Sequence, residues 1–110
     1  MNFNEYQIAA SRTAYPPRPD FADHDLCVTA LGLAGESGEV ADMIKKWVGH
    51  KHPRDVVKMK EELGDVLWYL ARMATLMGCT LDEVARMNVA KLEKRYPDGF
   101  SSQASIERKA

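Results

Sequence analysis

The 110-residue sequence lacks several features that define specialised classes of protein. Its two cysteines, Cys27 and Cys79, are too few for a disulfide scaffold, and we expect both to be buried free thiols. Neither sign of charge dominates, since 15 basic and 16 acidic residues leave a net charge of −1, which argues against nucleic-acid or membrane binding. No apolar run approaches the length of a membrane span, and the N-terminus lacks the pattern of a signal peptide. We therefore expect one cytoplasmic domain.

The chain also lacks the alternating pattern of β-strands and any internal repeat, and its apolar residues instead recur with helical spacing. The YPPRP stretch at residues 15–19 and the glycine at Gly49 mark helix ends. Asp55 is an expected N-cap, and Thr80 with Glu83 forms an expected capping box. The predicted helices cover residues 4–14, 23–48, 55–78 and 80–96.

The two longer helices set the expected architecture. Each has about 24 residues and is therefore about 36 Å long, whereas a compact chain of this length has a radius of gyration of about 13 Å. Two shorter helices cannot easily cover the apolar stripes of such rods. We therefore predict an all-α helical bundle of about four helices over residues 1–97, completed by self-association into a homo-oligomer. The polar residues 98–110 are expected to form a mobile tail.

Two pairs of acidic residues occupy equivalent positions on the two long helices. Glu36 and Glu39 lie at the edge of one apolar stripe, and Glu62 and Asp65 lie at the edge of the other. If the stripes pack together, the four carboxylates converge. Ordinary surface acids are the alternative, but such acids usually have cations three or four residues away. Only Glu62 has one, Lys58, so the cluster indicates a cation from outside the chain.

The donor atoms of the four acids indicate which cation the cluster is suited to bind. All four side chains offer hard oxygen ligands without histidine or cysteine, which favours Mg²⁺, or Mn²⁺, over zinc. Magnesium held by a few carboxylates commonly serves a phosphate substrate. The pattern therefore predicts metal-assisted hydrolysis of a phosphate compound.

The segments GESGEVADMIKK, KEELGDVLWYLARMA and NVAKLEKRYP together resemble the MazG-like nucleotide pyrophosphohydrolases of the all-α NTP pyrophosphatase superfamily. The resemblance implies a magnesium-dependent catalytic domain that cleaves (d)NTP to (d)NMP and pyrophosphate, clears noncanonical or excess nucleotides, and forms a dimer or a dimer of dimers. The family pattern EExxE…ExxD assigns metal binding to four residues of this chain. They are Glu36, Glu39, Glu62 and Asp65. Gly35 stands where the pattern has its first glutamate, and Glu61 is a candidate base or outer acceptor.

Further residues are candidates for substrate binding. The resemblance implies that Asn88, Lys91 and Arg95, which share one face of the last helix, hold phosphates and sugar. A solvated basic face is the alternative, most of all for Arg95. Tyr69 is either a phosphate ligand or a core residue, and Lys46 either reaches the acids or pairs with an aspartate on its own helix.

Other features of the sequence leave alternatives open. Trp47 fits the core, whereas Trp68 fits either a subunit interface or a base pocket. The glycines at 32, 35 and 38 permit either close helix packing or room for a nucleotide. His50 and His52 are too weak a zinc signal to include in the site. Phosphoribosyl-ATP pyrophosphohydrolase activity and a noncatalytic helical interaction module are the alternative functions.

Overall fold

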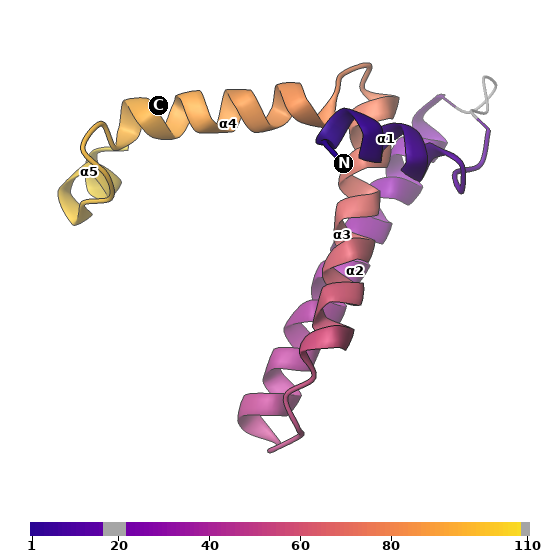
Figure 1. Cartoon of the computed structure of the whole chain (residues 1–110), viewed down its shortest axis with the longest axis horizontal. Helices are drawn as coiled ribbons and strands as arrows, with labels where there is room; N and C mark the ends of the chain where they lie inside the picture. The colour runs from indigo at the N-terminus through magenta and orange to yellow at the C-terminus, as the bar shows by residue number, and fades with distance from the viewer. Residues whose placement is uncertain (17–21, 109–110) are drawn as a thin grey trace.

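The computed structural model describes residues 1–16 and 22–108, and this part of the chain contains helices and no β-strand (Figure 1). The all-α prediction is confirmed. Most of the predicted YPPRP extension lies outside the described residues. The helices are α1 (Phe3–Ser11), α2 (Ala22–Gly49), α3 (Val56–Leu76), α4 (Leu81–Arg95) and α5 (Ser102–Glu107).

The long helices α2 and α3 lie side by side as an antiparallel hairpin (Figure 1). They have 28 and 21 residues. The expected N-cap is present, because an Asp55 carboxylate oxygen accepts a hydrogen bond of 3.0 Å from the backbone N–H of Lys58. No helix in the described residues is both long enough and apolar enough to cross a membrane.

A small core lies where α1 meets α3 and α4. Its buried members are Ala71, Ala74 and Leu81. Gln7 of α1 fastens this junction: its amide nitrogen donates to Thr75 Oγ1 and to the Cys79 carbonyl, each at 3.0 Å, and its amide oxygen accepts from the Leu81 N–H at 2.8 Å. These bonds satisfy backbone groups that the turn between α3 and α4 leaves unpaired.

Helix α4 leaves the end of the hairpin at a wide angle and continues away from it (Figure 1). Gly78, with a φ of +75°, makes the turn that permits this change of direction. The Thr80 hydroxyl caps α4 by accepting from the Glu83 N–H at 3.1 Å, which is one of the two hydrogen bonds of the expected capping box.

The structure differs from the sequence-based expectations at the end of α1, in the C-terminal segment and at the cysteines, as well as at Trp47, which fits the core by sequence but is 40% exposed. α1 ends at Ser11, three residues before the predicted end. A helix that was not predicted, α5, lies in the expected tail, where the Ser101 hydroxyl accepts from the Ala104 N–H. Cys27 is exposed and Cys79 only half-buried, so the expectation of two buried thiols is wrong. Cys27 lies on an exposed face of α2, and Cys79 lies in the turn before α4, where it packs only partly against the small core.

Candidate functional site

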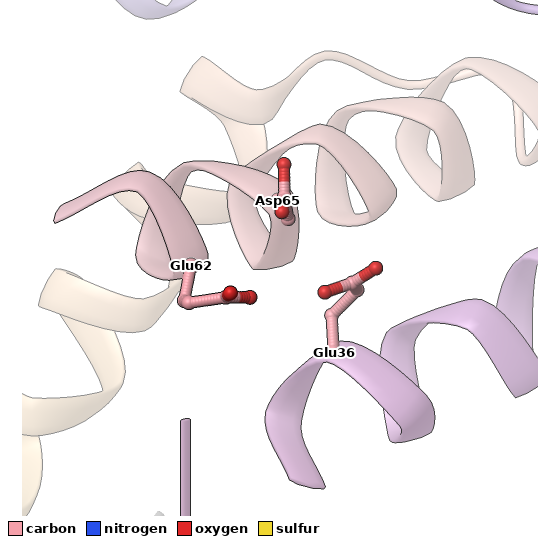
Figure 2. Close-up of side chains that lie close together, drawn as sticks. All are labelled: Glu36, Glu62 and Asp65. Carbon is pink, nitrogen blue, oxygen red and sulfur yellow. The ribbon is translucent and has the colours of Figure 1, made fainter. Parts of the chain in front are cut away.

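Three carboxylates from the two hairpin helices meet at one point (Figure 2). Glu36 comes from α2, and Glu62 and Asp65 come from α3. One oxygen of each side chain lies within 4.8 Å of one oxygen of each of the others. The three-residue spacing of the α3 acids puts both on the face that meets α2. The predicted convergence is therefore observed for these three acids.

The negative charges around Glu36 make its ionised form less favourable. Loss of contact with water, followed by the charges of Asp65, Glu62 and Glu39, raises the pKa of the Glu36 carboxyl above its usual value. Within the described part of the chain, none of these four acids forms an ion pair. The cluster is therefore electrostatically unfavourable by itself, and its hard oxygen donors fit a divalent cation such as Mg²⁺.

The other two acids of the expected site lie at its margin. Glu39 is exposed and outside the three-carboxylate group, but it lines a cavity of about 440 Å³ together with Glu62. Glu61 is exposed, and it lines neither this cavity nor the one on the other side of the acids. The structure thus brings Glu39 beside the cluster and leaves Glu61 facing solvent.

A second cavity, of about 370 Å³, lies on the side of the acids nearer α1. Glu36 and Asp65 line it with Thr13, Trp68 and Tyr69. The Trp68 indole N–H donates to Thr13 Oγ1 at 2.8 Å and to a backbone carbonyl of α1 at 3.1 Å, which ties α1 to α3. The Trp68 and Tyr69 rings pack edge to face with centroids 5.0 Å apart. Tyr69 therefore lines a cavity with Glu36 and Asp65 and also packs on Trp68.

One glycine has a clear packing role. A Cβ atom built on Gly32 would overlap the ring of Tyr69, so the absence of a side chain there lets α3 approach α2 closely. A Cβ at Gly35, Gly38 or Gly64 would meet nothing within 4 Å. Of the two interpretations that the sequence left open, close packing applies to Gly32.

Lys46 forms the ion pair that the sequence offered as one alternative. Its ammonium lies 2.8 Å from a carboxylate oxygen of Asp42, whose other oxygen lies 3.1 Å from Lys45. Hydrogen bonds from Lys46 and then Lys45 lower the pKa of Asp42. Lys46 still lines the 440 Å³ cavity with Glu39, so it contacts Asp42 and borders the acidic site at the same time.

The candidates on α4 are not brought to the acids within one chain. Asn88 and Lys91 are exposed, and none of the three α4 candidates lines either cavity that contains the acids. Arg95 is half-buried, and its Nε has no hydrogen-bond partner in the described structure. α4 packs against α1 and α3 and then extends away from the hairpin (Figure 1).

Comparison with known proteins decides the family. A model described as the MazG nucleotide pyrophosphohydrolase domain matches residues 27–100. This chain belongs to the MazG family. The chain is also 37% identical over 107 residues to a protein named Gene 37 protein from Mycobacterium phage L5, and the match covers 90% of this chain and 92% of the phage protein. No solved structure matches significantly.

Some residues around the acids in this MazG chain were not singled out as site residues from the sequence. Thr13 carries no motif and reaches its cavity only because α1 folds onto α3. His52, set aside as a zinc ligand, lines the 440 Å³ cavity with Lys58. The position of Lys58 four residues before Glu62 was a usable signal, since such residues share a helix face.

Proposed function

We propose that this MazG chain is a Mg²⁺-dependent nucleoside triphosphate pyrophosphohydrolase that cleaves (d)NTP to (d)NMP and pyrophosphate and removes noncanonical or excess nucleotides. Family membership supports nucleotide pyrophosphohydrolase chemistry. The observation that carries the proposal is the meeting of Glu36, Glu62 and Asp65 within 4.8 Å, with no cation of the described chain paired to them. Such a cluster is suited to a divalent ion that in turn binds phosphate.

The proposed roles follow from the positions of the side chains. Glu36, Glu62 and Asp65 would hold Mg²⁺, or Mn²⁺, with Glu39 completing the ligand set from the edge of the adjoining cavity. A bound divalent ion supplies neutralisation of phosphate charge and a lowered pKa for the attacking water. For Glu61, which faces solvent, the role of an assisting base rests on the family resemblance and not on its position. The hydroxyl of Tyr69 would donate to the substrate from the opposite side of the acids.

We also propose that the protein is a homo-oligomer, a dimer or a dimer of dimers. A compact folded monomer of this mass exposes about 6,100 Å², but this chain exposes 8472 Å². Its radius of gyration is 17.1 Å, against about 13 Å for a compact chain of this length. Trp47, expected in the core, is 40% exposed, and the neighbouring apolar residue Ile44 is 41% exposed. A second copy would cover these apolar side chains.

Association would also give the α4 residues a role. Asn88, Lys91 and Arg95 lie on a helix that extends away from the α2–α3 hairpin of its own chain (Figure 1). In an oligomer this helix could bring them to the acids of another copy, where their amide and cationic groups would bind substrate phosphates. Sedimentation analysis is the direct test, and a stable monomer at micromolar concentration would contradict this part of the proposal.

The catalytic proposal is tested with a panel of canonical and modified nucleoside triphosphates and phosphoribosyl-ATP. Product identification reports the bond that is cleaved. With Mg²⁺ present, we expect pyrophosphate release by the wild-type protein, and a loss of at least about 100-fold in Glu36→Gln, Glu62→Gln and Asp65→Asn. Glu93→Gln, which removes an exposed acid of α4, is the matched control and should keep full activity.

Two other results would change the proposal. Cleavage of phosphoribosyl-ATP in preference to every triphosphate would place the chain with the phosphoribosyl-ATP pyrophosphohydrolases. No pyrophosphate release from any substrate by a folded, Mg²⁺-supplied protein would leave a noncatalytic helical module. Circular dichroism of each variant separates loss of activity from loss of fold.

A further inference from the structure

The 440 Å³ cavity next to the acids extends toward the loop that joins α2 and α3. Its walls come from three consecutive parts of the hairpin. Glu39 and Lys46 belong to α2, His52 to the loop, and Lys58 and Glu62 to α3. The cavity is therefore continuous with the carboxylates at one end and contains cationic or imidazole groups at the other. Its volume lies within the usual range for small-molecule sites.

The loop places His52 in this cavity by backbone hydrogen bonds. The His52 N–H donates to the Lys46 carbonyl at 3.0 Å, and the His50 N–H donates to the same carbonyl at 3.1 Å. Lys51 between them has a φ of 59°, in the left-handed region, so the chain folds back over the end of α2. Only the second histidine lines the cavity.

Two further aspartates in the cavity wall already have partners. Asp42 is paired with Lys45 and Lys46, and Asp55 accepts the backbone N–H of Lys58 as the cap of α3. The ammonium of Lys58 forms no ion pair in the described structure. Lys58 and His52 therefore offer N–H donors to an anion, and a divalent ion at Glu36, Glu62 and Asp65 would offset the acidic wall beside it.

The cavity on the other side of the acids has a different character. Among the described residues it is lined by Thr13, Trp68 and Tyr69 in addition to the acids, and by no lysine, arginine or histidine. The carboxylate cluster is thus flanked by an aromatic cavity and by a cavity with cationic donors. A nucleotide has one end that suits each cavity: an aromatic base for the aromatic cavity and a phosphate chain for the cavity with cationic donors. A nucleotide bound across the cluster would therefore place its base in the aromatic cavity and its terminal phosphates in the cavity with cationic donors.

We infer that the cavity lined by Lys46, His52 and Lys58 binds the two terminal phosphates of a nucleoside triphosphate and then the pyrophosphate product. This inference rests on the proposed function. In the reaction, a water oxygen forms a bond to the α-phosphorus, and the bond from that phosphorus to the α–β bridging oxygen breaks. Pyrophosphate leaves with the electron pair of the broken bond, and the proton from water passes to the assisting base and from it to solvent. His52 and Lys58 thereby make the enzyme select triphosphates over diphosphates.

The test uses two pairs of matched variants of the full chain. His52→Ala and Lys58→Ala remove groups that line the cavity, whereas His50→Ala and Lys60→Ala remove the same kinds of side chain two residues away, outside its lining. Calorimetry measures the binding of pyrophosphate in the presence of Mg²⁺. We expect binding at least about tenfold weaker in each cavity variant, because hydrogen bonds to charged groups are strong, and within twofold of wild type in each control.

A kinetic measurement separates this inference from the proposed function. The ratio of kcat/KM for a nucleoside triphosphate to that for its diphosphate should fall in His52→Ala and Lys58→Ala and stay unchanged in the controls. If the wild type hydrolyses triphosphates but the cavity variants keep wild-type pyrophosphate binding, the inference is wrong and the function stands. If no nucleotide is hydrolysed but pyrophosphate binding depends on His52 and Lys58, the function fails and the cavity assignment stands. Absence of pyrophosphate binding to the wild type would overturn the assignment outright.

Discussion

The contact between Gly32 and Tyr69 makes a sharp prediction about stability. A Cβ atom on Gly32 would overlap three atoms of the Tyr69 ring, whereas a Cβ atom on Gly35, one turn along the same helix, would meet nothing within 4 Å. Both glycines lie inside α2, where replacement by alanine favours the helix. Alanine substitutions at the two positions therefore share the helix-propensity gain and differ chiefly in the presence of the Tyr69 ring.

The expected magnitudes follow from this difference. Gly35→Ala should raise the free energy of unfolding by about 0.5–1 kcal/mol, because it lowers the backbone entropy lost on folding. Gly32→Ala has the same gain, but the ring of Tyr69 must move and disturb its packing on Trp68. Overpacking of this kind costs about 1–3 kcal/mol. The two variants should thus differ by about 1–3 kcal/mol, or at least about 4 °C in Tm for a domain of this size.

Urea unfolding followed by circular dichroism measures the difference. All proteins are compared at one concentration, because association would make apparent stability depend on it. A double-mutant cycle isolates the contact: in a Tyr69→Ala background, Gly32→Ala should become as favourable as Gly35→Ala. Equal stabilisation by the two alanines in the presence of Tyr69 would refute the close approach of the helices at this point.

The remaining predictions concern other parts of the fold. Gln7→Ala should lower the free energy of unfolding by about 1–3 kcal/mol in urea titrations, because it removes three hydrogen bonds at the α1–α3–α4 junction. The control Gln103→Ala loses one exposed hydrogen bond on α5 and should change the free energy of unfolding by at most about 0.5 kcal/mol. The raised pKa of Glu36 means that its ionisation opposes folding above that pKa. Glu36→Gln should therefore have a higher Tm than wild type at neutral pH in EDTA, and the advantage should vanish as the pH falls through the raised pKa. The lowered pKa of Asp42 has the opposite sign, so Asp42→Asn should have a slightly lower Tm at neutral pH and should match wild type in acid. A neutral-pH Tm below wild type for Glu36→Gln would contradict the first assignment, and one above wild type for Asp42→Asn would contradict the second.

The sequence predicted the helices well where side chains act on their own helix. Asp55 and Thr80 cap α3 and α4 as expected, because capping depends on residues only three positions away. The end of α1 was less predictable. The Thr13 hydroxyl hydrogen-bonds back to the Ala10 carbonyl, and the prolines of the YPPRP stretch set only an upper limit to the helix.

The direction of α4 could not be predicted from local patterns. It depends on the left-handed turn at Gly78 and on the hydrogen bonds that Gln7 makes across more than 60 residues of chain. Asn88 and Lys91 share a helix face as expected, but their helix extends away from the acids (Figure 1). Spacing along α4 therefore identified the face that carries Asn88 and Lys91, but it could not identify which other part of the structure that face contacts.

The convergence of the acids could be predicted only on the condition that the two apolar stripes pack together, because it depends on the register between the helices as well as on spacing along each. In an antiparallel hairpin, one turn forward on α2 corresponds to one turn backward on α3. Once Gly32 packs on Tyr69, Glu36 must therefore lie near Asp65, and Glu39 near Glu62.

The same glycine contact thus sets the spacing of helices at the acids. A helix pair forced apart at Gly32 would also separate the carboxylates one turn away, since each helix moves as a rigid rod. Gly32→Ala should consequently weaken Mg²⁺ binding as well as stability, whereas Gly35→Ala should affect neither adversely despite lying next to Glu36. Calorimetric titration with Mg²⁺ distinguishes the two. Loss of binding in Gly35→Ala alone would mean that the closeness of the carboxylates does not depend on the approach of α3 to Gly32.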